Sequence, residues 1–377
     1  MAKRFIQLLK KKFNMKTINL FHPYYNGKKI QKAMKSMFPG NRSNRWLGQG
    51  PKVDEFEKKF GEKFNYKYCL ALNSGSAALE LAYHLIGLKE GDEVIYPVLT
   101  CTATGIPLLR RGVKIIFADI NEDNWTIDVE DVKRKITKKT KAIIAVTLGG
   151  LPINPEVAKI ARKYKIPLVI DACQSLGVSE KFGDYICYSL QAIKHFTTGD
   201  GGFLVVRNKK LYKRAKKLRW FGIDREKRVR NNFQPYKGRE MTMDISETGY
   251  KFHMNDIAAT LGFINLEDSD KILEKRKWIA EYYKKNLFYP VIVGGAYWLA
   301  GILVRDRDKV AKELSVAGIE TNMAHLRNDI FSVFGGTRQN LPVMNGIESY
   351  YLYIPLHYQL TMKQVKYIVK ILNQING

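Results

Sequence analysis

Short β-rich runs alternate with amphipathic helical patterns from residue 66 to residue 206 of this chain. Runs such as Ile166-Pro-Leu-Val-Ile170 are apolar throughout, which is typical of parallel strands buried on both faces. The alternation therefore predicts an α/β fold in which helices cover both faces of a parallel sheet, in three α/β/α layers. The predicted strands cover residues 68–72, 93–96, 114–119, 141–147, 167–172, 185–190 and 202–207, and the predicted helices cover residues 76–86, 102–110, 129–136 and 155–164.

The pattern changes after about residue 255. A long helical stretch over residues 256–287 is followed by shorter α and β signals and a closing helix near residues 362–372, which predicts a smaller C-terminal α/β domain. We therefore expect a basic N-terminal extension (residues 1–16), a large domain (residues 17–255) and a small domain (residues 256–377). The polar and basic segment 224–244 fits neither period and is predicted to be a loop near the site or at a subunit contact.

The charge balance is strongly basic, with 63 Lys and Arg against 36 Asp and Glu and a net charge of +27. Such a surface attracts nucleic acids, anionic lipids or phosphorylated small molecules. The lysines are spread along the whole chain, without a zinc finger or an RNA-binding aromatic motif, so nucleic acid is not an expected partner. The four cysteines are scattered and form no CxxC pair, which favours reduced thiols over a metal site.

No apolar stretch is long enough to span a bilayer, and the first residues lack the apolar core and cleavage site of a secretory signal. We expect no integral membrane segment and a cytoplasmic protein. The start of the chain is nevertheless basic and amphipathic, and two interpretations stay open: a membrane-surface anchor, or an upstream extension before Met15.

Three short segments at the ends of predicted strands together contain what an aldehyde-phosphate cofactor requires. In Leu72-Asn-Ser-Gly-Ser-Ala-Ala-Leu79 a strand ends and a small-residue turn opens a helix, where exposed backbone N–H groups suit a phosphate and Gly75 permits close approach. Helix capping by Ser74 or Ser76 is the alternative.

The other two segments carry an acid and an amine. Asp171 directly follows an apolar strand, and a protonated pyridine nitrogen would compensate a carboxylate there, although helix capping explains it equally well. Lys194 follows a predicted strand and precedes a glycine-rich turn, and a lysine in a desolvated pocket has a lowered pKa that lets it form an imine and carry a proton. An ordinary surface lysine is the alternative.

The ordered set of motifs resembles the DegT family of sugar aminotransferases, which have the aspartate-aminotransferase type of pyridoxal-phosphate-dependent transferase fold. The resemblance runs from about Asn19 to Ile371. Besides the three segments it includes Gln49-Gly-Pro51, Thr100-Cys-Thr-Ala-Thr104, Gly249-Tyr-Lys-Phe-His-Met254, Gly318-Ile-Glu-Thr321 followed by His325, and Ile354-Pro-Leu-His357.

The resemblance implies a role for each matching residue. Lys194 would be the Schiff-base lysine and proton shuttle, Asp171 the partner of the pyridine nitrogen, and Gln174 the partner of the ring hydroxyl. Gly75, Ser76 and Ser189 would hold the phosphate.

Further roles implied by the resemblance concern the subunit contact and the sugar pocket. Lys251, where the family usually has Asn, would reach the phosphate of the neighbouring subunit in a homodimer with shared active sites. His325 would contact the substrate. The family normally places a cofactor-stacking aromatic ring where this chain has Cys101.

The implied reaction moves an amino group from L-glutamate to a keto-deoxysugar carried on a nucleoside diphosphate, most often a 4-keto-6-deoxy sugar, to make an amino sugar for glycan synthesis. A 3-keto sugar stays open as an alternative. A pyridoxamine-dependent sugar dehydratase is disfavoured because those relatives replace the lysine by histidine, whereas Lys194 is present. A non-catalytic regulatory protein that binds pyridoxal phosphate is the rival from another class.

Overall fold

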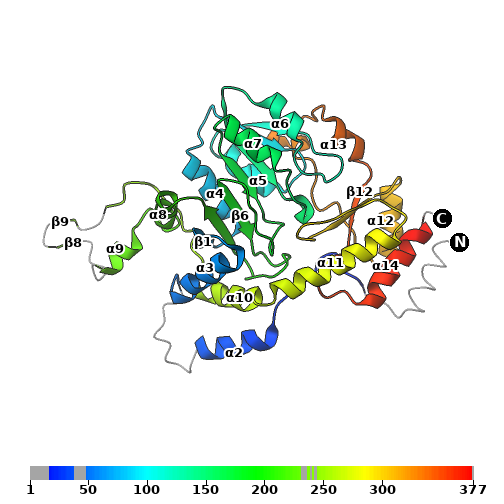
Figure 1. Ribbon diagram of the computed structural model, residues 1–377, viewed down its shortest axis with the longest axis horizontal. Coiled ribbons are helices and arrows are strands. Elements are labelled where there is room, and N and C mark those ends of the chain that lie inside the picture. Colours follow the sequence, from blue (N-terminus) through cyan, green and yellow to red (C-terminus); the bar gives the residue numbers. More distant parts are fainter. Residues whose placement is uncertain (1–16, 38–47, 231–235, 238–239, 242–243, 376–377) are drawn as a thin grey trace.

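A seven-stranded sheet lies at the centre of the computed structural model, in the strand order β1-β7-β6-β5-β4-β2-β3 (Figure 1). The structure describes residues 17–37, 48–230, 236–237, 240–241 and 244–375, so the predicted extension over residues 1–16 lies outside it. The strands are β1 (Cys69–Leu72), β2 (Glu93–Pro97), β3 (Lys114–Ala118), β4 (Thr140–Val146), β5 (Leu168–Asp171), β6 (Tyr185–Ser189) and β7 (Gly202–Val206).

The sheet is mixed, so the prediction of a parallel sheet is wrong for one strand, β7, which lies between the edge strand β1 and β6. Strands β2 to β6 pair in parallel, whereas β7 is antiparallel to both of its neighbours, β6 and β1. A parallel connection needs a long crossover, usually a helix, and the segment between β6 and β7 contains no helix. The chain therefore turns back directly, and this turn carries Lys194.

Helices cover both faces of the sheet, as the alternation predicts. The strand side chains alternate between two cores: Ile143 and Ile170 point into one, and Ile144 and Val169 into the other. The first core is closed by α3 (Pro51–Phe64), α6 (Val129–Lys135), α7 (Glu156–Lys163) and α10 (Asp256–Leu266), and the second by α4 (Gly75–Ile86), α5 (Thr102–Leu109) and α8 (Lys209–Leu218).

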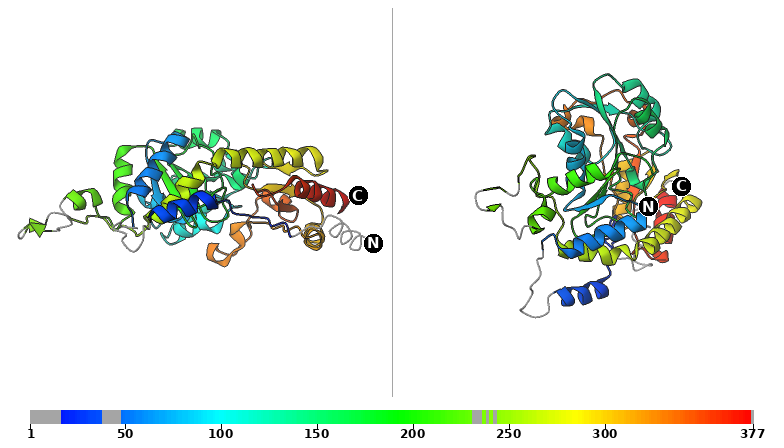
Figure 2. Two further views of the ribbon diagram at one scale, coloured as in Figure 1. Left: turned by 90° about the horizontal axis from the view of Figure 1, so that it is seen from below. Right: turned by 60° about the vertical axis from the view of Figure 1, so that its left-hand side comes forward.

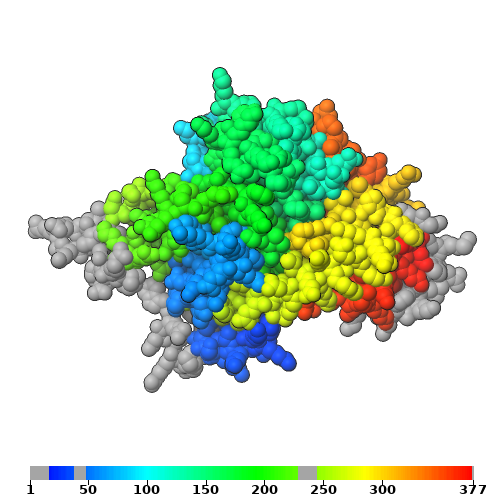
Figure 3. Space-filling model, in the orientation of Figure 1, coloured from blue at the N-terminus to red at the C-terminus, as the bar shows by residue number. Residues whose placement is uncertain are grey.

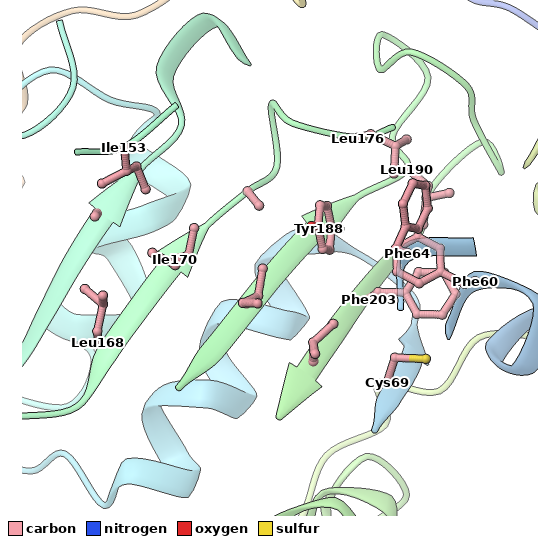
Figure 4. Close-up of a cluster of buried hydrophobic side chains, with 14 of the residues drawn as sticks. Phe60, Phe64, Cys69, Ile153, Leu168, Ile170, Leu176, Tyr188, Leu190 and Phe203 are labelled. Atoms are coloured by element: carbon pink, nitrogen blue, oxygen red, sulfur yellow. The ribbon is translucent and has the colours of Figure 1, made fainter. Parts of the chain in front are cut away.

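Aromatic rings fill the first core where α3 meets the sheet (Figure 4). Phe60 stacks on Phe203 of β7 with ring centroids 3.8 Å apart, and its edge contacts Phe64 and Tyr188. Helix α10 packs against the outer side of α3, which the space-filling view shows as blue atoms against yellow-green ones (Figure 3). This packing fixes the edge of the sheet that carries β1, β7 and β6.

The C-terminal part has its own antiparallel sheet and its own core. Helices α11 and α14 lie together at the end of the molecule away from α8 and α9 (Figures 1 and 2). The elements are α11 (Ser269–Asn286), β10 (Val291–Ile292), β11 (Ala300–Leu303), α12 (Arg307–Val316), α13 (Pro342–Ile347), β12 (Tyr351–Ile354) and α14 (Met362–Ile375). Near the start of the described chain, before α2 (Gly27–Met37), Ile18 pairs with Ile319 of this C-terminal part.

Two local predictions are corrected. The helical stretch over residues 256–287 is two helices, α10 and α11, and the Asp268 carboxylate at the break accepts hydrogen bonds from Tyr24 (2.5 Å) and Asn26 (3.0 Å), which tie the break to a distant segment. Segment 224–244, predicted as loop, contains α9 (Arg225–Arg230) and the paired strands β8 (Tyr236–Lys237) and β9 (Glu240–Met241). Within the described ranges, no helix combines the length and the apolarity that a membrane span requires.

Candidate active site

Polar residues gather at the carboxyl ends of β5 and β6, where an open α/β sheet places its ligands. Asp171 is the last residue of β5 and is buried. Its carboxylate accepts a hydrogen bond from the Thr104 hydroxyl at 2.7 Å and another from the backbone N–H of Cys173 at 3.1 Å. The two bonds fix the orientation of the carboxylate and leave acceptor capacity for a cationic partner.

The glycine turn after β1 lies against the end of β6. Ser74 caps α4, since its hydroxyl oxygen accepts a hydrogen bond from the backbone N–H of Ala77 at 3.0 Å. Gly75 begins the helix, and a Cβ atom there would lie 2.8 Å from both the Sγ of Cys173 and the Cβ of Ser189. Only glycine fits at this position, and Ser76 in the same first turn is exposed. The Ser74 cap predicted as an alternative therefore exists alongside an open helix N-terminus.

Lys194 lies in the turn between β6 and β7 and is only 9% exposed. Among the described residues, no ion pair involves its amine; its Nζ instead lies 4.0 Å from the centroid of the Trp298 ring. Burial lowers the pKa of Lys194 below its ordinary value, and the nearby Asp171 carboxylate opposes part of that shift. An amine in these surroundings is closer to its neutral, nucleophilic form than a surface lysine.

Gln174 and His325 form a hydrogen-bonded pair beside Lys194. The Gln174 Oε1 accepts a hydrogen bond from the backbone N–H of Gly149 at 2.6 Å, so its amide N–H is left to donate to the His325 Nε2, 2.9 Å away. His325 is consequently neutral, with its proton on Nδ1. Burial, followed by the charge of Lys194, lowers the pKa of His325 to about 3.

The loop that carries His325 is fastened to the loop after β2. The fully buried Asn328 donates from its amide to the backbone oxygen of Thr100 at 2.7 Å and accepts a short hydrogen bond from the Tyr96 hydroxyl. Its backbone N–H also donates to the oxygen of Val98 at 2.7 Å. The neighbouring Arg327 and Asp329 form a buried ion pair, with two N–H···O bonds of 2.6 and 2.7 Å.

The structure thus brings together six of the eight residues predicted for the site: Gly75, Asp171, Gln174, Ser189, Lys194 and His325. Ser76 lies on the same turn as Gly75 and is exposed, and its predicted contact with the phosphate stays a prediction. Lys251 is exposed, and its backbone oxygen accepts a hydrogen bond from the Asn73 amide at 3.1 Å, beside the glycine turn. Its predicted contact with a neighbouring subunit stays a prediction.

Two neighbours of the site were not singled out from the sequence. Thr104, which holds Asp171, belongs to a segment that the family resemblance marks. No sequence pattern links Trp298 to the site, because it lies more than a hundred positions after Lys194 and just before β11 of the C-terminal sheet. It supplies an aromatic face at the amine, whereas Cys101 supplies none at the N-terminus of α5.

These side chains fit pyridoxal phosphate. A helix N-terminus with a glycine that no larger residue could replace suits the phosphate, Asp171 suits a protonated ring nitrogen, and Gln174 suits the ring hydroxyl. Lys194 is a buried amine within the electrostatic influence of Asp171. The donor set is therefore the one that an aldehyde-phosphate cofactor needs.

Comparisons with known proteins agree with this geometry. The model of the DegT/DnrJ/EryC1/StrS aminotransferase family matches residues 28–373. The GDP-perosamine synthase of Escherichia coli O157:H7 is 29% identical over 378 residues, 96% of this chain and 99% of that protein. The sugar aminotransferase CalS13 of Micromonospora echinospora has a TM-score of 0.83 at 28% identity, over 95% of this chain and 99% of that one. The PMP-form of Spr1654 of Streptococcus pneumoniae has a TM-score of 0.85 at 25% identity, over 95% and 98%.

Proposed function

Since this chain belongs to the DegT/DnrJ/EryC1/StrS aminotransferase family, we propose that it uses pyridoxal phosphate to move an amino group from L-glutamate to a keto-deoxysugar carried on a nucleoside diphosphate. The observation that carries the proposal is the Lys194 amine, which is buried, has no carboxylate ion pair among the described residues and lies within the influence of Asp171. A surface lysine would be neither buried nor close to a buried carboxylate.

When bound, pyridoxal phosphate supplies an aldehyde that links to amines and a pyridine ring that takes up the electrons left when a proton departs. Asp171 would pair with the protonated ring nitrogen, since hydrogen bonds from the Thr104 hydroxyl and the Cys173 backbone N–H hold its carboxylate in place. Lys194 would hold the cofactor between turnovers and would carry a proton on its Nζ during amine transfer. Ser189 and the turn at Gly75 would hold the phosphate.

The site draws on both proposed domains, since His325 comes from residues 256–377 and the other residues come from residues 17–255. His325 is neutral and hydrogen-bonded to Gln174, so it is a hydrogen-bond donor through Nδ1 for a polar group of the substrate. We assign Lys251 to the phosphate of a second copy of the chain, which makes the protein a homodimer with shared sites.

The substrate class rests on the relatives and on charge. A UDP-4-amino-4,6-dideoxy-N-acetyl-β-L-altrosamine transaminase of Campylobacter jejuni is 29% identical over 85% of this chain, and the amino group at position 4 of the 4,6-dideoxy sugar in its name supports a 4-keto-6-deoxy substrate. A net charge of +27 favours a diphosphate-bearing substrate over a neutral free sugar.

An absorption spectrum of the purified protein with pyridoxal phosphate, before and after L-glutamate, tests the proposal. The wild type and a Lys209→Ala control, an exposed lysine on α8, are expected to show the visible band of lysine-linked cofactor and to lose it with glutamate. A Lys194→Ala variant is expected to lack that band. A wild type without the band would overturn the role of Lys194, and a band that glutamate leaves unchanged would overturn the donor.

A substrate screen tests the second half of the reaction. With glutamate as donor, we expect amine transfer to a nucleotide-linked 4-keto sugar and slower or no transfer to a 3-keto sugar. The reverse order would identify the 3-keto alternative, and transfer only to free keto acids would overturn the sugar substrate. Absence of any transfer would favour the non-catalytic regulatory protein.

A further inference from the structure

Trp298 is held rigidly beside the lysine of the site. It is 2% exposed and lies just before β11. Its backbone N–H donates to the oxygen of Gly149 at 3.0 Å, and its indole N–H donates to the oxygen of Ile193 at 3.2 Å. The second bond ties the ring to the residue directly before Lys194, so the indole and the amine keep their mutual position.

The face of the ring is directed at the amine. The Nζ of Lys194 lies 4.0 Å from the ring centroid, well inside the range of a cation–π contact. Two other rings fix the plane of the indole: Phe21 at 5.5 Å and His325 at 6.2 Å between centroids, both within 31° of parallel. The indole therefore cannot turn its edge to Lys194 without displacing these neighbours.

The nearby Asp171 carboxylate stabilises a charge on Lys194 only in part, because the pKa of Lys194 is still lowered by burial. Burial disfavours the ammonium form, and no carboxylate forms an ion pair with it among the described residues. An amine that carries a proton during transamination must pass through that ammonium form. The negative face of an indole stabilises an ammonium, most strongly where water is excluded.

We propose that Trp298 is a positioning residue that holds the free Lys194 amine at the reacting end of the site and stabilises it when it takes up the proton. The inference rests on the proposed function, because it concerns the interval in which Lys194 is not linked to the cofactor. It also places the aromatic ring of the site at the amine, whereas position 101, a cysteine, has none.

The geometry is testable without cofactor. In protein labelled with carbon-13 at the lysine ε carbons, the Lys194 signal, identified by its loss in Lys194→Met, is expected to be shifted upfield by the indole ring. Trp298→Leu should remove the shift and Trp298→Phe should keep most of it. A Lys194 signal at the ordinary lysine position in the wild type would overturn the contact.

The function of the contact is tested by the half-reaction with L-glutamate in single turnovers. We expect Trp298→Leu to slow it about tenfold or more, the fold-change of a desolvated cation–π contact, with an increased isotope effect for glutamate deuterated at the α carbon. The KM for glutamate should change little. Trp298→Phe, which keeps the ring face but loses the Ile193 bond, should recover most of the rate.

Failure of the inference and failure of the proposed function give different results. If the wild type forms no lysine-linked cofactor or does not react with glutamate, the proposed function fails. If the wild type reacts and Trp298→Leu keeps both its rate and its isotope effect, only the role of Trp298 is overturned. A Trp298→Phe variant as slow as Trp298→Leu would likewise overturn the ring face as the cause.

Discussion

Replacing Asn328 by alanine should loosen the connection between the two loops that flank the site. The change removes the partner of the buried Tyr96 hydroxyl and of the buried Thr100 backbone oxygen. A buried polar group left without a partner costs about 1–3 kcal/mol, and because two such costs in one place are not fully additive, we expect a loss of about 2–4 kcal/mol.

Urea unfolding measures the total loss, and hydrogen exchange locates it. The backbone amides of residues 99–104 and 322–328 should exchange faster in Asn328→Ala, whereas those of β4 should not. The matched control is Asn208→Ala, an exposed asparagine whose side chain accepts one hydrogen bond at the start of α8 and should cost about 1 kcal/mol. A loss no greater than that of the control, with unchanged exchange in both loops, would refute the reasoning.

Three further outcomes are expected. Asp329→Ala should cost about 1–3 kcal/mol in urea unfolding, because Arg327 keeps its ion pair with Glu348 (3.1 Å) but loses both hydrogen bonds to the buried Asp329 carboxylate, and adding Arg327→Met should recover part of the loss; a double variant less stable than the single one would contradict this. His325 has its ordinary pKa of 6.5 in the unfolded chain and a pKa of about 3 in the folded chain, so only the unfolded chain takes up this proton between these values. The free energy of unfolding should therefore fall as the pH drops from 6.5 towards 3, and it should fall less steeply in His325→Gln. Gly75→Ala should weaken pyridoxal phosphate binding in a fluorescence titration and destabilise by about 1–3 kcal/mol through crowding, while Gly27→Ala, where a Cβ meets nothing within 4 Å, should do neither.

The sheet could be predicted from the sequence because its strands are buried on both faces. The run predicted at residues 167–172 became β5 (Leu168–Asp171), and the end of that run placed Asp171 correctly at the carboxyl end of the strand. The direction of β7 could not be predicted, since an apolar run looks the same in a parallel and an antiparallel pair. The break at Asp268 was missed because helical periodicity continues through it, and the hydrogen bonds that tie it to Tyr24 and Asn26 leave no mark in the local sequence.

The residues of the candidate site divide in the same way. Gly75, Asp171 and Lys194 could be predicted because each lies at or after the end of a strand, and the carboxyl ends of parallel strands lie along the same side of the sheet. The contact between Lys194 and Trp298 could not be predicted, because it depends on how the C-terminal part packs on the central sheet. Whether Lys251 reaches a second copy of the chain is likewise not encoded in any local pattern.

The antiparallel turn between β6 and β7 has a consequence for redesign of this protein. Ser189 and Gly202 are paired across the two strands, and the backbone N–H of Leu190 donates a 2.8 Å hydrogen bond to the oxygen of Gly201. The two ends of the segment that bears Lys194 are therefore held together. Because Ser189 belongs to the paired strands, a change in this segment that shifted the strand register would displace Ser189 together with Lys194, so substitutions that keep the length of the segment are the safer choice in redesign.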